Sequence, residues 1–168
     1  MTPDLAQGIR DTLVDSIEQE VPKTRRVLAA VPAANRDYKP DDKSRSAWEL
    51  ATHIATADVW FLDSIIDGKF EWGEGAGRIP AEMTSPENVA KWYETHVPQR
   101  LARLRSLTGE QLLRPVTFAG TNQPDVMWLL LMNNHSIHHR GQLAAYLRAA
   151  GSKVPALFGV SADENAFG

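Results

Sequence analysis

The sequence predicts an all-α protein built as a four-helix bundle. Four long segments carry the 3.6-residue periodicity of amphipathic helices, and none shows the alternation of a half-buried strand. The 168 residues have the length of one ordinary domain and contain no internal repeat. Helices with one apolar face must bury those faces against one another, and a bundle of four achieves this. We therefore expect residues 1–168 to form a single domain.

The first two predicted helices are separated by a polar, proline-containing loop. The first covers residues 2–28, opens with a proline in its first turn and contains Pro22 as a candidate kink. The loop covers residues 31–45. The second helix covers residues 46–67, since it begins with the S-x-x-E pattern of a capping box and stops before Gly68.

Two further long helices are predicted in the second half of the chain. The third covers residues 86–104, again with a proline in its first turn. A second capping box over residues 108–111 marks a short turn. The fourth helix is expected to begin around residues 123–125 and to end at Gly151, because glycine is the usual residue just past a helix end. Residues 153–168 are expected to form an ordered strap.

Residues 68–84 are the longest irregular stretch and are rich in glycine. They lack the Lys-Ser/Thr pair of a phosphate-binding P-loop and have no strand before them. We therefore expect a mobile loop near the mouth of a site.

Composition excludes several classes of protein. The net charge of −3 and the sequence pI of about 5.9 leave no basic face for nucleic acid. No apolar run approaches the ~20 residues of a membrane span, and the N-terminus lacks the apolar region of a signal peptide. A cytoplasmic protein without membrane or nucleic-acid partners is therefore expected. The absence of cysteine excludes disulfides, thiolate metal ligands and a protein thiol nucleophile.

Histidines are the strongest chemical signal in the chain. Turning about 100° per residue, a helix places His139 about 40° from His135, and both fall in the middle of the apolar arc of the fourth helix. His53 lies on the apolar face of the second helix. Three neutral imidazoles that leave one position open form a catalytic rather than a structural zinc site. The alternative is three buried histidines with ordinary hydrogen-bond partners.

Other polar residues near these histidines are candidates for supporting roles. His138, about 60° from His135, is expected to line the pocket. Gln142 and Tyr146 continue the same face and are expected to line the pocket or to hydrogen-bond a fourth ligand, with simple packing as the alternative. Glu49, one turn before His53, is expected to orient the free ring nitrogen of that histidine.

The opposite side of the fourth helix is also apolar. Leu130, Ile137 and Ala144 lie about 180–220° from His135, and a helix that is apolar on both faces is usually buried on both. We therefore expect a homodimer through this face. Arg140, about 140° from His135, is expected at the surface or at the interface.

Two stretches of the chain resemble the DinB superfamily of DinB/YfiT-like proteins. The resemblance rests on WELATHIATADVWFLDSIIDGKF around His53 and on NNHSIHHRGQLAAYLRAAGSKVP, which contains an H-x-x-x-H-R-G-Q motif. It implies a four-helix bundle of up-down-down-up connectivity and a divalent metal, often nickel or zinc, held by three histidines. The pattern of the family maps onto His53, His135 and His139. Characterised relatives include transferases and isomerases that use low-molecular-weight thiols.

The residue pattern favours thiol chemistry over hydrolysis. Coordination alone deprotonates a thiol, whereas a hydrolase needs a base, and no Asp or Glu lies between residues 126 and 162. A hydrolase would have to use Glu49, Asp58 or Asp125. The expected protein is a divalent-metal-dependent enzyme that activates an external thiol toward a small-molecule substrate. The alternatives are a metal-dependent hydrolase and a non-catalytic, stress-associated metal-binding protein. Zinc or nickel is the expected metal, and iron or manganese also suits three imidazoles.

Overall fold

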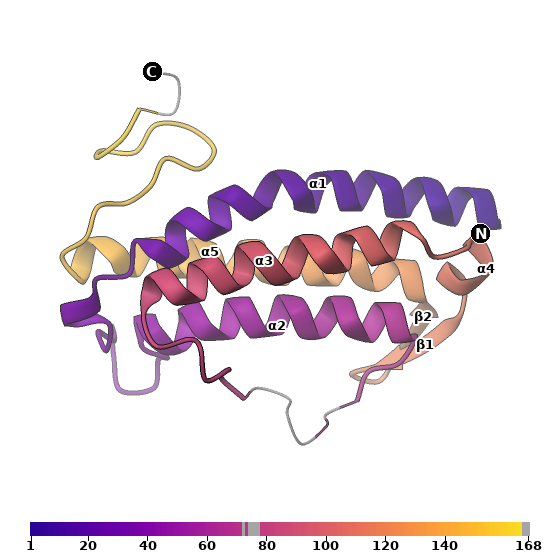
Figure 1. Ribbon diagram of the computed structural model, residues 1–168, viewed down its shortest axis with the longest axis horizontal. Helices are drawn as coiled ribbons and strands as arrows, with labels where there is room; N and C mark the ends of the chain where they lie inside the picture. The colour runs from indigo at the N-terminus through magenta and orange to yellow at the C-terminus, as the bar shows by residue number, and fades with distance from the viewer. Residues whose placement is uncertain (72, 74–77, 166–168) are drawn as a thin grey trace.

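A computed structural model describes residues 1–71, 73 and 78–165, and these residues are mostly helical (Figure 1). The described residues contain five α-helices, α1 (Pro3–Ala29), α2 (Ala47–Asp67), α3 (Pro86–Arg105), the one-turn α4 (Gly109–Leu112) and α5 (Trp128–Ala149). The predicted helical character is therefore confirmed. Within these residues no helix has the length and apolar character needed to cross a membrane.

The four long helices lie alongside one another. Helix α1 packs against α3 and α5, and α2 packs against the same two helices. In Figure 1, α1 and α5 run from right to left, whereas α2 and α3 run from left to right. The fully buried apolar side chains come from all four helices and include Val14, Leu28, Leu50, Ile54, Leu62, Val97, Leu101, Leu129 and Leu143.

The capping boxes form where the sequence predicts them. The Oγ atom of Ser46 accepts a hydrogen bond from the Glu49 backbone N–H at 3.1 Å, and Oε2 of Glu49 accepts one from the Ser46 N–H at 2.7 Å. The same reciprocal pair joins Thr108 and Gln111 at the start of α4. Helix α1 continues through Pro22.

A short antiparallel hairpin adds a small sheet to the fold, which was predicted to be all-α. Strands β1 (Pro115–Phe118) and β2 (Thr121–Pro124) pair with Phe118 opposite Thr121, so only Ala119 and Gly120 form the turn. Both turn residues have positive φ, 50° and 78°, as a type I′ turn requires. Val116 is the one buried residue among the eight in these strands, so they carry no apolar alternation that sequence could reveal.

The hairpin also delays the start of the last long helix. Residues 123–125 were expected to open it, but 123 and 124 belong to β2, and a 3₁₀ turn (Asp125–Met127) precedes α5. The Asp125 N–H donates to the Arg114 carbonyl at 2.9 Å, which extends the ladder beyond the last strand residue. Pairing with β1 therefore takes these residues out of the helix.

The segment that follows α5 lies against the ends of α1 and α5. Gly151 has φ of 87°, the left-handed conformation that ends a helix. Beyond it, the Ser152 hydroxyl donates to the Ala30 carbonyl at 2.6 Å, and Arg26 donates to the Ala156 carbonyl at 2.8 Å. The end of the predicted strap, residues 166–168, lies outside the described residues, as do positions 72 and 74–77 of the predicted mobile loop.

A buried polar network joins α2, α3 and α5. Oδ2 of Asp58 on α2 accepts hydrogen bonds from the Tyr93 hydroxyl of α3 at 2.9 Å and from the Ser136 hydroxyl of α5 at 2.7 Å. Burial raises the pKa of Asp58 to about 7, because the charged form loses its hydration, although both hydroxyls and Arg140 favour that form. These contacts set the rotation of α5 against its neighbours.

Arg140 is buried, contrary to its expected place at the surface or at an interface. It is 1% exposed, forms an ion pair with Glu20 of α1 and donates to the Thr24 hydroxyl at 2.9 Å. Its guanidinium also lies 5.3 Å from the ring centre of Phe158 in the C-terminal segment. A helical wheel gives the direction of a side chain but not the polar partners that the neighbouring helix supplies, and these partners make burial of the charge feasible.

Replacing Asp58 by Asn should change how stability depends on pH. The folded-state pKa of Asp58 is raised, so its stabilising contribution is complete below the unfolded value near 4 and is lost as pH rises through about 7. Relative to the wild type, Asp58→Asn should therefore gain on the order of 3–4 kcal/mol of unfolding free energy between pH 4 and pH 8. Urea denaturation of both proteins across this range measures the difference. A difference that stays constant with pH would contradict the assignment.

Candidate metal centre

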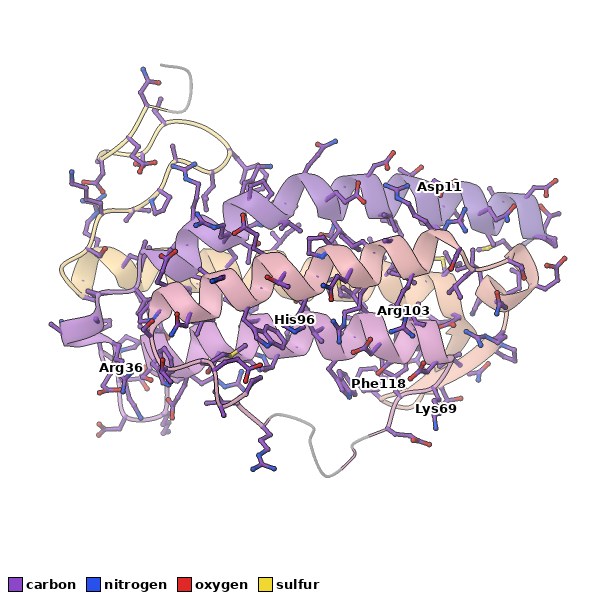
Figure 2. The ribbon with its side chains drawn as sticks, in the orientation of Figure 1. Asp11, Arg36, Lys69, His96, Arg103 and Phe118 are labelled. Carbon is purple, nitrogen blue, oxygen red and sulfur yellow. The ribbon has the colours of Figure 1, made fainter. Side chains whose placement is uncertain are left out.

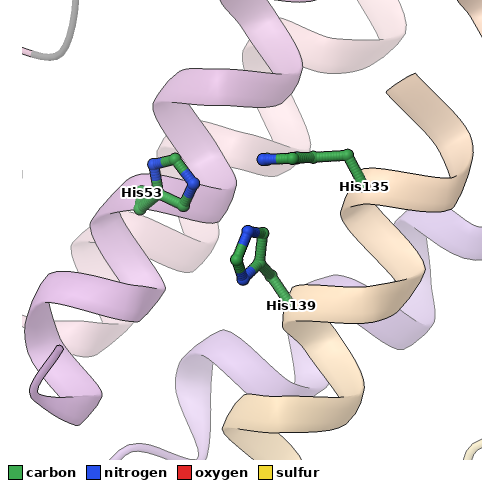
Figure 3. Close-up of side chains that lie close together, drawn as sticks. All are labelled: His53, His135 and His139. Atoms are coloured by element: carbon green, nitrogen blue, oxygen red, sulfur yellow. The ribbon is translucent and has the colours of Figure 1, made fainter. Parts of the chain in front are cut away.

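Three histidines from two helices gather at one place between α2 and α5. His53 comes from α2, and His135 and His139 lie one turn apart on α5 (Figure 3). The ring centre of His53 lies 5.1 Å from that of His135 and 4.8 Å from that of His139, and the ring centres of the two α5 histidines are 4.5 Å apart. One nitrogen from each ring lies within 4.8 Å of the others. Nitrogens that share a zinc ion lie about 3–4 Å apart, so small ring rotations bring this group to coordinating distance.

The packing of α2 against α5 explains why these rings meet. His53 lies between buried residues of α2, with Leu50 one turn before it and Ile54 directly after it. On α5, Ser136 and Arg140 follow His135 and His139 directly in sequence, and their hydrogen bonds hold them toward the interior of the protein. The two histidines are rotated by about 100° from these anchors and so face α2.

The three imidazoles are held in their neutral form. Burial lowers the pKa of His53 to about 3 and that of His135 to about 4, because a charged ring would lose its hydration. The guanidinium of Arg45 and the neighbouring rings lower both values further. Burial also lowers the pKa of His139. Neutral imidazole is the form that coordinates a metal, so no proton has to leave these rings at neutral pH.

Two observations show that the residues suit a divalent cation. Nδ1 of His135 is buried and has no hydrogen-bond partner within the described part of the chain, which is costly for an imidazole nitrogen. Among the described residues, His53, His135 and His139 are also the one group of His, Asp or Glu side chains with metal-ligand spacing. Three imidazole nitrogens suit zinc, nickel or iron.

Gln142 and Tyr146 extend the site along α5. Oε1 of Gln142 lies 3.1 Å from Nδ1 of His139, and Nε2 of Gln142 donates to the Tyr146 hydroxyl at 3.3 Å. Because an amide oxygen only accepts, Nδ1 of His139 carries the proton, and its Nε2 is left with a lone pair. Tyr146 is buried and meets the ring of Tyr38 edge-on at 5.9 Å.

The other two predicted residues lie at the margin of the site. His138 is exposed, with its ring centre 4.9 Å from that of His139. Glu49 serves the capping box of α2, and the hydrogen bond from the Ser46 N–H lowers the pKa of its carboxyl group. Its predicted contact with the His53 ring is not among the hydrogen bonds of the described residues, so that role stays a prediction.

His96, which lies on α3 (Figure 2), stacks on Trp92 with ring centres 4.1 Å apart.

Two cavities meet at His53, and they contain residues that sequence reasoning missed. A cavity of about 240 Å³ is lined by Arg45, Glu49, Thr52, His53, Thr56 and Ile79. A second cavity of about 390 Å³ is lined by His53, Thr56, Ala57, Trp60, Phe61, Phe118, Ala119, Leu131 and His135. On α2, the positions three, four and seven residues after His53 face this second cavity, and this helical spacing could have identified Trp60. The wall contributed by Phe118 depends on the unforeseen hairpin.

The fold and the site together define the class of the protein: a helical protein with three imidazoles gathered between two of its helices. A model of the DinB family matches residues 4–166, and the chain belongs to this family. It is 30% identical over 131 residues to the uncharacterized protein YjoA of Bacillus subtilis (strain 168), an alignment that covers 76% of this chain and 82% of YjoA. It is 24% identical over 155 residues to YrdA of the same organism, also called uncharacterized, with 92% and 90% covered.

Solved structures of DinB-like proteins have similar folds. The crystal structure of the DinB-like protein YjoA from Bacillus subtilis matches with a TM-score of 0.67 and 28% identity, covering 87% of this chain and 97% of YjoA. A DinB-like protein from Bacillus cereus ATCC 10987 matches with a TM-score of 0.72 and 25% identity, covering 88% and 97%.

Removing one histidine of the trio should weaken metal binding. We expect protein purified without nickel resin to bind one divalent ion per chain, and His53→Gln to lower the affinity at least ~100-fold, because one of three ligands is lost. Gln142→Ala should lower it about 10–100-fold, since the orienting partner of His139 is removed. Competition with a chromogenic chelator measures each affinity. His96→Gln is the matched control, and equal affinity in His53→Gln and the control would contradict a metal site at the trio.

Proposed function

We propose that the protein is a divalent-metal-dependent enzyme in which His53, His135 and His139 hold the ion and an external thiol is the activated cosubstrate. The observation that carries the proposal is the convergence of three neutral imidazoles beside two cavities. A bound divalent cation would supply Lewis acidity and lower the pKa of a thiol. Zinc or nickel suits the donor set best, and iron or manganese would also be accepted.

The side chains around the trio would support binding rather than proton transfer. Gln142 accepts from Nδ1 of His139 and so presents the other ring nitrogen to the ion. In the reaction, the thiol proton leaves to solvent, and the sulfur lone pair forms a bond to an electrophilic carbon. In a transferase reaction, the bond from that carbon to the leaving group breaks, and the leaving group departs with the electron pair. A thiol-dependent isomerase would add and later expel the same thiol.

A metal-dependent hydrolase is the second candidate function. It needs a carboxylate near the histidine trio to act as a base. Asp58 is buried and accepts hydrogen bonds from side chains of α3 and α5. Asp125 is buried and forms an ion pair with Arg114 at 2.9 Å. Neither lines the two cavities at His53. Glu49 does line the smaller cavity, so it is the carboxylate on which a hydrolase would depend. A non-catalytic metal-binding protein is the third candidate.

The arrangement of the helices is consistent with the expected bundle. Each long helix contacts two others, and α2 and α3 run opposite to α1 and α5 (Figure 1). These features support a single four-helix-bundle domain of up-down-down-up connectivity. A cytoplasmic location, where low-molecular-weight thiols are abundant, completes the proposal.

Glu49→Gln should separate the two enzymatic candidates. Glutamine preserves the capping box, so the variant should fold normally, but it has no base. With metal-loaded protein, glutathione or cysteine and 1-chloro-2,4-dinitrobenzene, we expect thiol transfer in Glu49→Gln within ~3-fold of the wild type and a loss of at least ~100-fold in His53→Gln. Hydrolysis of 4-nitrophenyl acetate that is lost in Glu49→Gln would establish the hydrolase instead. Turnover of neither substrate by metal-loaded protein would favour the non-catalytic candidate.

We also propose a homodimer through the outer face of α5. Leu130 and Ile137 remain 43% and 37% exposed, and Ala144 is half-buried beside them. Apolar side chains on one exposed face favour association. We expect light scattering at micromolar concentration to give twice the mass of the chain, and Ile137→Glu to reduce it to the mass of the monomer. A wild-type protein that is already monomeric would refute this.

A further inference from the structure

The larger cavity at the site, which we call the aromatic cavity, differs in chemistry from the smaller one. None of the described residues that line it is charged at neutral pH. Three of the lining residues are aromatic, namely Trp60, Phe61 and Phe118. Thr56 adds no free donor, because its hydroxyl donates to the Thr52 carbonyl at 2.9 Å. The indole N–H of Trp60 likewise donates to the Glu71 carbonyl at 3.1 Å, and the imidazoles of His53 and His135 belong to the histidine trio. The smaller cavity, across His53, contains Arg45 and Glu49.

The walls of the aromatic cavity are preformed by ring contacts. Phe118 stacks on Phe70 at 4.6 Å and meets Trp60 and Phe61 edge-on at 5.6 and 5.9 Å. Phe61 lies 5.3 Å from the His135 ring, so the aromatic wall continues directly to the metal-binding group. Rings that pack on one another keep the cavity open at little cost in conformational entropy when a ligand binds.

The hairpin carries one wall of the cavity and is firmly anchored. Arg114, just before β1, donates to the Ile65 carbonyl at the end of α2 at 3.2 Å and pairs with Asp125 at 2.9 Å. The indole N–H of Trp128 donates to the Val116 carbonyl of β1 at 3.2 Å. Figure 2 shows Phe118 at the hairpin, next to α2.

The turn of the hairpin places a strained alanine in the cavity wall. Ala119 has φ of 50°, a conformation that costs a residue with a Cβ about 1–2 kcal/mol, and type I′ turns usually place Asn, Asp or Gly there. Asn or Asp would bring a polar group into an apolar wall. Backbone strain that persists at a ligand-sized cavity points to a role in binding.

We propose that the aromatic cavity binds an uncharged aromatic group of the electrophilic substrate and directs its reactive carbon toward the histidine trio. Its volume of about 390 Å³ lies near the lower end of ligand pockets, which suits one or two rings. An ionised group packed against these rings would lose its hydration without gaining a partner, and only the ion held by the histidine trio could offer one. This inference rests on the proposed function, since that function supplies the electrophile.

A pair of probes of equal shape tests the cavity. 2-Naphthol is neutral at pH 7, whereas naphthalene-2-sulfonate carries a negative charge on the same ring system. Equilibrium dialysis against the full chain after removal of the metal with EDTA should give at least ~10-fold tighter binding of 2-naphthol, because the walls and not the ion select the ring. The measurement is repeated with the metal-loaded full chain, which should bind 2-naphthol at least as tightly. Equal binding of the two probes, or no binding of 2-naphthol, would overturn the proposal.

Variants locate the binding to this cavity. Leu131→Glu places a charge in the lining and should weaken 2-naphthol binding at least ~10-fold, and Ala57→Phe should fill the space and abolish binding. Leu131 is 38% exposed, so its replacement should not prevent folding. Leu5 of α1, 55% exposed and outside the lining, provides the control Leu5→Glu, which should bind like the wild type. Equal weakening by both glutamates would place the probe elsewhere.

The outcomes also separate this proposal from the proposed function. Selective 2-naphthol binding without any thiol transfer would refute the enzymatic proposal and leave the cavity assignment standing. Thiol transfer that proceeds equally well in the wild type, Leu131→Glu and Ala57→Phe would refute the cavity assignment and leave the thiol chemistry standing.

Discussion

The rotation of α5 is the constraint on which the site depends, and buried polar contacts set it. Ser136 donates to Asp58 of α2, and Arg140 binds Glu20 and Thr24 of α1. Removing one partner of a buried charge leaves the other uncompensated, so α5 cannot turn about its axis without a large cost. Because His135 and His139 directly precede these two anchors, the same contacts hold both imidazoles toward α2. One face of α5 thus carries the anchoring residues Ser136 and Arg140, and the neighbouring face carries the two histidines.

Burial disfavours the charged form both in the site and in its support. It lowers the pKa of the three imidazoles, which keeps their lone pairs available, and it raises the pKa of Asp58 to about 7. Desolvation would destabilise an isolated charge, but here it keeps the imidazoles neutral, which is the form that coordinates a cation. Asp58 instead holds the helices together through its hydrogen bonds with Tyr93 and Ser136.

The two cavities that meet at His53 differ in the chemistry of their walls. One cavity has charged and polar walls with Arg45 and Glu49, and the other is walled by rings and by the hairpin turn. The hairpin is short, but it provides Phe118 and Ala119, and its anchoring by Arg114 connects the cavity wall to the end of α2.

Local sequence determined the helices, their capping boxes and the helix faces that carry His53, His135 and His139, because helical periodicity and capping depend on residues within one or two turns. The hairpin escaped prediction, since four-residue strands exist only through pairing with each other. The burial of Arg140 also escaped, because it depends on Glu20 and Thr24, which lie 116 to 120 positions away in sequence. Likewise, only the tertiary structure brought Phe118 to the histidines. Contacts between distant segments decide which polar groups can be buried and which rings share a wall, and no local pattern contains that information.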